Sequence, residues 1–206
     1  MADLPPDAQR SLIEEGARRI AEWTGRRPVA FRAGNMGASE ETLEQLGRAG
    51  IAIDSSYCFV YVGGQCRFSP TAPWNGSRWF GRVLEVALSG YRQTRLPPLR
   101  PSKPLDVVGI SFPEMRRGIE RVGRSAATVV LILHSFSLFK VRDRQYSDGR
   151  PNRIVIRRFV NLCRWLAANA NTWPAETFSD LARDVEAGEF RALDAEPPRV
   201  RAVAGA

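Results

Sequence analysis

The sequence predicts one α/β domain in which helices alternate with the strands of a parallel sheet. Segments with apolar residues at helical spacing alternate with short apolar runs, and the most apolar run, residues 128–133, is rich in β-branched side chains, as central parallel strands are. With 206 residues, 44% of them hydrophobic, the chain can bury one sizeable core. The chain opens with a helix, whereas a (β/α) barrel begins with a strand, so a fold of that type would be partial or distorted here, with its N-terminal strands missing.

The first half of the chain contains two predicted helix-to-strand steps. Ile13, Ala17 and Ile20 share one face of the first helix. Ser39 is placed to cap the second helix, and Gly50 to end it. In order, the predicted elements are a helix over 7–24, a strand over 28–32, a glycine-rich turn over 33–37, a helix over 39–49 and a strand over 51–53.

The second half repeats this rhythm after a long connection. Residues 55–104, rich in glycine, proline and aromatic residues, are interpreted as an elaborated loop with short strands of its own, expected over the extended stretches 57–62 and 83–88. The elements expected after it are a strand over 105–110, a helix over 112–122, a strand over 128–133, a helix over 153–168 and a helix over 178–185. The helix over 153–168 carries one apolar face, made of Val155, Phe159, Leu162, Cys163 and Leu166. The domain is expected to span 1–192, followed by a flexible tail over 193–206.

The net charge of +8 does not indicate a nucleic-acid partner. All basic residues except Lys103 and Lys140 are arginines spread along the whole chain, whereas a nucleic-acid-binding face needs clustering. The basic segment 140–158 is either a solvated surface or a dock for phosphate or uronate groups. Three cysteines without close spacing predict neither a disulfide framework nor a zinc site. With no apolar leader and no run of about 18 apolar residues, we expect a cytoplasmic protein without a membrane span.

Three chemically active side chains follow predicted strands. Arg32, Asp54 and His134, the one histidine of the chain, each stand at the carboxyl end of a strand, where α/β folds place their chemistry. Together they form a candidate acid/base constellation. The alternative assigns each a structural role, with Arg32 in an ion pair, Asp54 capping a turn and His134 hydrogen-bonded.

The runs 27–35, 53–56 and 133–137 resemble, in this order, conserved blocks of the polysaccharide deacetylase family, carbohydrate esterase family 4. The resemblance extends over nearly the whole chain. It implies a distorted (β/α) barrel that removes acetyl groups from N-acetylated glycans, with a divalent, zinc-type metal that polarises the amide and activates water. An N-acetylated polysaccharide is therefore the expected partner.

The resemblance also implies roles for individual residues. Arg32 would orient the catalytic base, and Asp54 would tune His134, which would protonate the departing amine. A carboxylate beside His134 would favour the imidazolium that this role requires. The substrate-binding residues implied or suggested by this comparison are Gly34, Asn35, Ser135, Phe136, Tyr57 and Trp79. For Tyr57 and Trp79 the alternative to stacking on sugar rings is packing the elaborated loop onto the domain.

The chain departs from the family pattern at the metal site. Family members hold the metal with an Asp-Asp block and a His-x-x-x-His block, but this sequence has a single histidine and no Asp-Asp pair. The metal ligands of the family are therefore not present. We expect a polysaccharide deacetylase-like fragment that is inactive alone, or alternatively a non-catalytic remnant that binds a glycan or a protein partner.

Overall fold

The structure, a computed structural model, describes residues 1–69, 72–93, 102–141, 148–188 and 190. Within them the α-helices are α1 (Pro6–Thr24), α2 (Glu40–Arg48), α3 (Phe112–Val122), α4 (Arg153–Ala168) and α5 (Phe178–Glu186). Short 3-10 helices are η1 (Gly34–Met36), η2 (Phe59–Tyr61) and η3 (Ser135–Leu138). The expected tail over 193–206 lies outside the described residues.

The strands form one four-stranded sheet and two hairpins. Their bounds are β1 (Ala30–Phe31), β2 (Ile53–Asp54), β3 (Ser77–Phe80), β4 (Val83–Val86), β5 (Gly90–Arg92), β6 (Ser102–Pro104), β7 (Phe139–Lys140) and β8 (Arg150–Pro151). The sheet has the order β1-β2-β4-β3, in which β1, β2 and β4 are parallel and β3 returns antiparallel to β4. β5 pairs with β6, and β7 with β8.

The helices lie where the sequence predicts them, because their end signals are local. Ser39 and Thr42 form a capping box at the start of α2, and Ser111 accepts a hydrogen bond from the amide of Glu114 at the start of α3. Gly25 follows α1 in the left-handed conformation, with φ of 73°, which a glycine adopts without steric cost.

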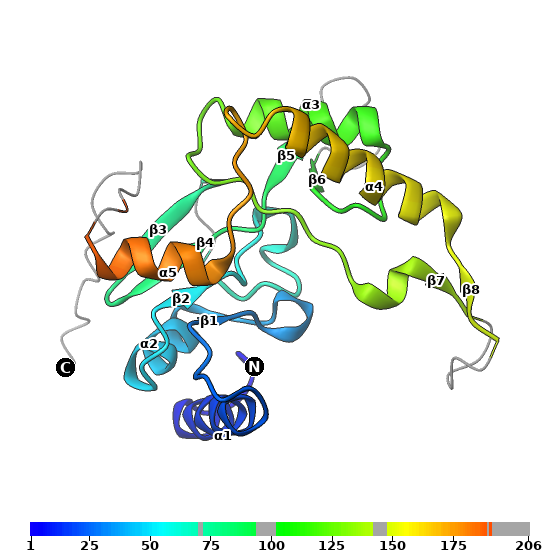
Figure 1. The fold of residues 1–206 in the computed structure, drawn as a ribbon. Coiled ribbons are helices and arrows are strands. Elements are labelled where there is room, and N and C mark those ends of the chain that lie inside the picture. The colour runs from blue at the N-terminus through cyan, green and yellow to red at the C-terminus, as the bar shows by residue number, and fades with distance from the viewer. Residues whose placement is uncertain (70–71, 94–101, 142–147, 189, 191–206) are drawn as a thin grey trace.

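The elements are arranged as helices around a small sheet. In Figure 1, α1 and α2 lie together at one end of the molecule, and α3 and α4 lie at the opposite end, over β5 and β6. The four-stranded sheet lies between them with α5 beside it, while the β7–β8 hairpin extends away from the body at the start of α4. Separate apolar clusters form beneath α1–α2, beneath α3–α4 and between the sheet and α5.

Of the two extended stretches expected within the loop over 55–104, the one over 83–88 is confirmed by strand β4, whereas the one over 57–62 is not. β4 is an inner strand of the sheet, between β2 and β3, because Leu84 and Val86 are fully buried in the cluster shared with α5. The stretch 57–62, expected to be extended, contains η2 instead. The loop therefore contributes the third strand of the sheet, and only part of it is an insertion.

The apolar run 128–133 lies between two of the clusters. Val130 and Ile132 pack against the α1–α2 cluster, and Val129, Leu131 and Leu133 against the α3–α4 cluster. This alternation is that of a strand, but the only ladder contact assigned to it among the described residues is a parallel bridge from Ile132 to Asp106. Likewise 105–110, expected to be a strand, contributes that bridge and then turns.

Within the part of the chain that the structure describes, one edge of this run has no hydrogen-bonding partner. The amide of Val130 donates to Ser89 Oγ at 3.0 Å, and the amide of Ile132 donates to the Leu105 carbonyl at 3.0 Å. The backbone groups of the alternate residues, Val129, Leu131 and Leu133, form no hydrogen bond within the described part of the chain. At the other end, β1 pairs with β2 alone. The described strands therefore form no closed barrel, and the outer edges of β1, β3 and the run 128–133 are unpaired among the described residues.

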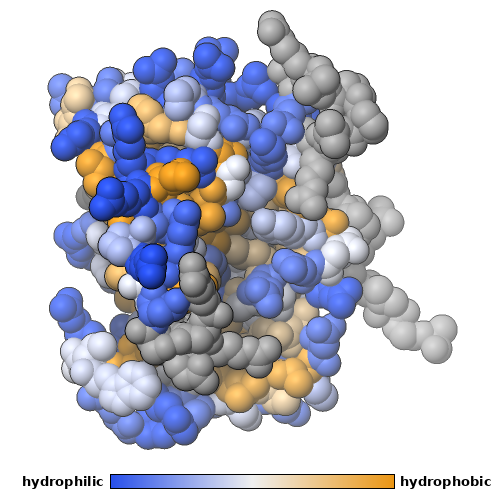
Figure 2. Space-filling view, turned by 90° about the vertical axis from the view of Figure 1, so that its right-hand side faces the viewer, coloured by the Kyte–Doolittle hydropathy of each residue, from blue (hydrophilic) through white to orange (hydrophobic). Residues whose placement is uncertain are grey.

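Apolar side chains also reach the surface. Figure 2 shows patches of hydrophobic residues set among hydrophilic ones on the side that carries the β7–β8 hairpin. The apolar face expected on α4 is only partly covered, since Val155 and Leu162 are buried whereas Phe159 is 38% exposed. Ile154 at the start of the same helix is 60% exposed. Among the described helices, none is both long and apolar enough to cross a membrane.

The open edge of the run 128–133 predicts association between molecules, because unpaired strand edges pair with other chains. We expect the purified protein to elute from size-exclusion chromatography, with light scattering, as species larger than one chain. Val129→Pro removes an amide of the open edge and should reduce association. Val130→Pro also replaces a valine with a proline, but it removes in addition the hydrogen bond from the Val130 amide to Ser89 Oγ. The melting temperature of Val130→Pro should therefore be lower than that of Val129→Pro by about 2–4 °C. A sharp monomer peak for the unmodified protein would contradict this prediction.

Candidate functional site

Two carboxyl groups lie side by side in the interior of the sheet. Asp54 ends β2, and its register partner on β4 is Glu85; both residues are 0% exposed. Ser56 donates to Asp54 through its hydroxyl at 2.8 Å and its amide at 3.1 Å. The amide of Tyr57 donates to Glu85 Oε1 at 2.8 Å, while the buried Glu85 Oε2 has no hydrogen-bond partner within the described residues.

The pKa values of both acids are raised. Burial raises the pKa of Glu85 well above its ordinary value, and the neighbouring charge of Asp54 raises it further. Burial also raises the pKa of Asp54, although its interaction with Glu85 and hydrogen bonds from Ser56 act in the opposite direction. Of the two acids, Glu85 therefore has the stronger tendency to stay protonated, because its burial and the charge of Asp54 both raise its pKa.

Arg32 places a positive charge next to these acids. It follows β1 directly and donates to the Ser55 carbonyl through Nε and to the Ser55 hydroxyl through Nη2, both at 2.7 Å. The Phe178 ring of α5 lies 6.0 Å from its guanidinium carbon. Burial lowers the pKa of Arg32, and the charges of Asp54 and Glu85 oppose that shift. We call Arg32, Asp54 and Glu85 the buried acid cluster.

The turn after β1 is tied to this cluster. The amide of Ala33 donates to Ser56 Oγ at 2.8 Å, and that hydroxyl in turn donates to Asp54. The next residues, Gly34 and Asn35, are exposed, and Asn35 and Met36 have φ of 52° and 56°. Consecutive non-glycine residues in the left-handed region store backbone strain, which concentrates at functional sites. The predicted substrate residues Gly34 and Asn35 thus form an exposed, strained rim beside Arg32.

His134 lies outside the buried acid cluster. It is exposed at the end of the run 128–133, and its ring stacks on Phe136 with centroids 4.9 Å apart and an angle of 11° between the planes. No hydrogen bond or ion pair joins it to Asp54 in the described part of the structure, and Asp54 is closed to solvent. The structure therefore brings together Arg32 and Asp54, and it places His134, Ser135 and Phe136 on a separate exposed segment.

The remaining predicted substrate residues pack the loop. Tyr57 is 2% exposed, stacks on Trp74 at 4.1 Å and meets the edge of Phe68 at 5.4 Å, so its ring is not available to a sugar in this arrangement. Trp79 is half-buried in β3, where it pairs with Leu84. Tyr57 therefore packs the loop onto the domain and is not exposed for stacking on a sugar ring, whereas Trp79 is only partly buried in this way.

The residues present do not fit the divalent metal that the family resemblance implies. His134 is the one histidine of the chain, and its ring lies against Phe136. Asp54 and Glu85 are occupied with each other, Ser56 and Tyr57. Across the described ranges there is no group of three or more histidine, cysteine or acidic side chains that could hold a metal ion.

Glu85 is the functional candidate that the sequence reasoning missed. The sequence did contain a signal for it, because a carboxylate in the middle of the apolar run 83–86 is unusual unless it has a buried partner.

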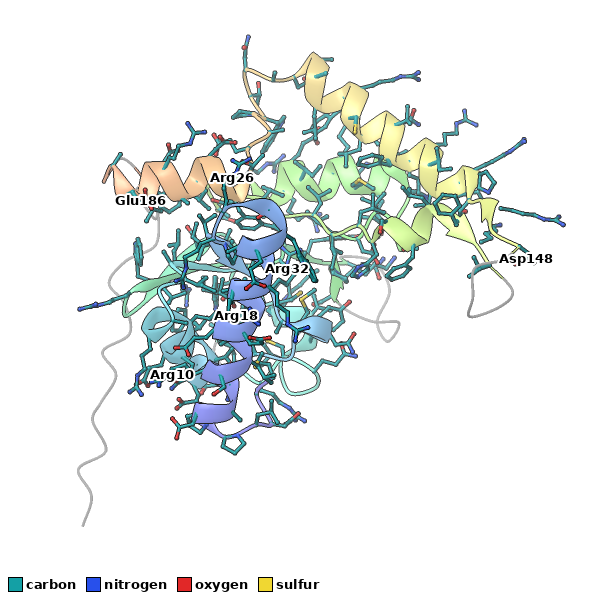
Figure 3. All side chains as sticks on the ribbon, turned by 60° about the horizontal axis from the view of Figure 1, so that its bottom comes forward. Arg10, Arg18, Arg26, Arg32, Asp148 and Glu186 are labelled. Atoms are coloured by element: carbon teal, nitrogen blue, oxygen red, sulfur yellow. The ribbon has the colours of Figure 1, made fainter. Side chains whose placement is uncertain are left out.

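The arginines, which are spread along the sequence, also lie on many different elements of the described structure. In Figure 3 charged side chains project from many elements, with Arg10 and Arg18 on α1 and Asp148 and Glu186 far apart at opposite sides.

Comparison with known proteins adds no assignment: no family model matches the chain, and searches of curated proteins and of solved structures gave no match.

The raised pKa of Glu85 predicts a dependence of stability on pH. The pKa of Glu85 is higher in the folded than in the unfolded chain, so the folded state binds more protons, and the unfolding free energy falls as pH rises above its ordinary value of 4.5. Glu85→Gln cannot ionise and can still donate to Asp54. We expect denaturant unfolding of this variant to change less with pH and to give higher stability than the unmodified protein near pH 8.

Glu85→Ala is the matched control. It removes the acceptor of the Tyr57 amide and leaves a cavity, so it should lower the unfolding free energy by about 2–4 kcal/mol at every pH. Equal pH dependence of Glu85→Gln and the unmodified protein would show that the pKa of Glu85 is not raised.

Proposed function

We propose that this chain is a polysaccharide deacetylase-like protein that carries the Arg32–Asp54 part of such a site and does not hydrolyse N-acetyl groups by itself. The observation that supports it is that these two residues close neighbouring parallel strands, with Phe31 and Asp54 in register, and join one electrostatic cluster. The alternative of unrelated structural roles does not require both to meet at one end of the sheet.

The exposed rim beside Arg32 supports the same proposal. Arg32 uses Nε and Nη2 on Ser55, and its Nη1 forms no hydrogen bond within the described residues, so a donor remains for a carboxylate or for substrate. Gly34 and Asn35 expose a strained turn next to it. In a complete site, amides of this turn would stabilise the oxyanion that forms on the amide carbonyl.

His134 is exposed at the surface, where a substrate can reach its ring. Hydrolysis of an N-acetyl group consumes water and releases acetate and a free amine. The amine nitrogen has to accept a proton when the C–N bond breaks. In the proposal His134 supplies that proton once it faces the amine. The described residues provide no metal ligand set, so a water-activating group has to come from a segment other than these.

Acetate release from N-acetylglucosamine oligomers tests the inactive state. With purified protein we expect no acetate above the blank, with or without added Zn²⁺. Acetate release that His134→Ala abolishes would show that the chain is a complete enzyme and would overturn the proposed inactivity.

The proposed lineage is tested on the native protein from its source cells, by intact mass and peptide mapping. A mass above 23.0 kDa with Asp-Asp and His-x-x-x-His peptides is expected. In that protein His134→Ala should lower turnover by about 10²-fold or more with unchanged metal content. A mass of 23.0 kDa beginning at Met1 would overturn the expectation that the chain is part of an active deacetylase, and it would favour the non-catalytic remnant instead.

A second candidate function, glycan binding without catalysis, is favoured by the exposed stack of His134 and Phe136. Phe136 is 55% exposed, and an aromatic face at the surface suits the apolar face of a sugar ring.

Calorimetric titration with N-acetylated and deacetylated oligosaccharides tests this function. Phe136→Ala should weaken binding about tenfold, because it removes one exposed stacking ring. Trp23→Ala, which removes a 78% exposed ring on α1, should leave binding unchanged. No heat with either class of oligosaccharide would exclude glycan binding of this kind.

A further inference from the structure

We infer that the pocket between β5 and the end of α3 binds the carboxylate of an acidic sugar unit, a uronic acid. The pocket is an open depression of about 310 Å³, lined by residues from η2, the segment before β3, β5, the end of α3 and the turn after it. It is separate from the buried acid cluster and from His134. The identity of the sugar class rests on the proposed function, whereas the anion site rests on the pocket itself.

One wall of the pocket is apolar and firmly placed. The Phe59 ring lies directly on the backbone of Gly90, so close that a Cβ at position 90 would stand 2.7 Å from the ring. Asn75 holds the same glycine from the other side, since its side chain donates to the Gly90 carbonyl at 3.0 Å and accepts from the Gly90 amide at 2.8 Å. Pro73 extends this wall. The wall therefore presents a fixed, flat apolar surface.

Most polar groups of the lining are already used within the protein. Asn75 is bonded to Gly90, the Tyr91 hydroxyl donates to Glu114 at 2.6 Å, and Ser125 Oγ donates to the Val122 carbonyl at 3.3 Å. A neutral ligand that needs both donors and acceptors would find few of either kind free.

Two guanidinium groups are the exception. Arg92 and Arg121 line the pocket, are exposed, and form no ion pair within the described part of the chain. Arg121 donates once, through Nη1 to the Arg92 carbonyl at 2.8 Å, which holds it at the rim and leaves its other donors free. Free donors without free acceptors select an anion, and the guanidinium fork matches a carboxylate.

The size and shape of the pocket define the rest of the ligand. A volume of about 310 Å³ is at the small end of ligand pockets and suits one sugar unit rather than an extended chain. The C–H face of a pyranose would lie on Phe59 while its carboxylate meets Arg92 and Arg121. A uronic acid carries both features.

Titration calorimetry with glucuronate at low salt tests the inference, with N-acetylglucosamine and inorganic phosphate as comparison probes. We expect glucuronate to bind, with an affinity that falls as salt rises. Arg92→Gln and Arg121→Gln should each weaken binding about tenfold. Arg116→Gln is the matched control, because Arg116 is also an exposed arginine of α3 but pairs with Glu120 and does not line the pocket. It should bind glucuronate like the unmodified protein.

Several results would overturn the inference. N-acetylglucosamine binding as tightly as glucuronate would exclude selection of an anion, and equal affinity for phosphate would exclude the sugar. Equal weakening in all three arginine variants would show only a general effect of charge. This test does not depend on catalytic activity. If the protein binds glucuronate through Arg92 and Arg121 but does not bind N-acetylated oligosaccharides, the result would support this inference and contradict the proposed glycan class.

Discussion

The burial of two carboxyl groups against each other is the constraint on which the sheet depends. Neither Asp54 nor Glu85 reaches water, so one of them has to stay protonated and the other has to be neutralised by neighbours. Ser56 and Tyr57 supply hydrogen bonds and Arg32 supplies the positive charge. Because these groups come from β1, β2, β4 and the segment after β2, the cluster fixes the parallel strands relative to one another.

The segment that follows β2 connects this cluster with the pocket beside α3. The amide of Tyr57 donates to Glu85, and its ring stacks on Trp74. Two residues later, Phe59 packs on Gly90 and forms one wall of the pocket. The chain therefore uses one short stretch to close the sheet interior and to shape a surface cavity. Any shift of this stretch would alter the electrostatics of Asp54 and the width of the pocket together.

The helices were predictable from sequence because their signals are local. Ser39, Ser111 and Gly25 mark ends that depend on a few adjacent residues, and α3 and α4 have the predicted bounds. Strand pairing depends on distant residues, so the apolar run over 128–133 gave no sign that only one of its edges would be paired. The meeting of Arg32 and Asp54 followed from adjacent parallel strands. The partnership with Glu85 did not, because register across a sheet cannot be read from one strand.

The position of 128–133 between two apolar clusters has a consequence for how the molecule unfolds. Its alternate side chains belong to the α1–α2 cluster and to the α3–α4 cluster, so neither cluster can lose its packing without exposing one side of the same segment. Two clusters that share a strand-like partner behave as one cooperative unit, although each would look like a separate folding unit if viewed alone. This short run therefore couples the packing of the two ends of the molecule.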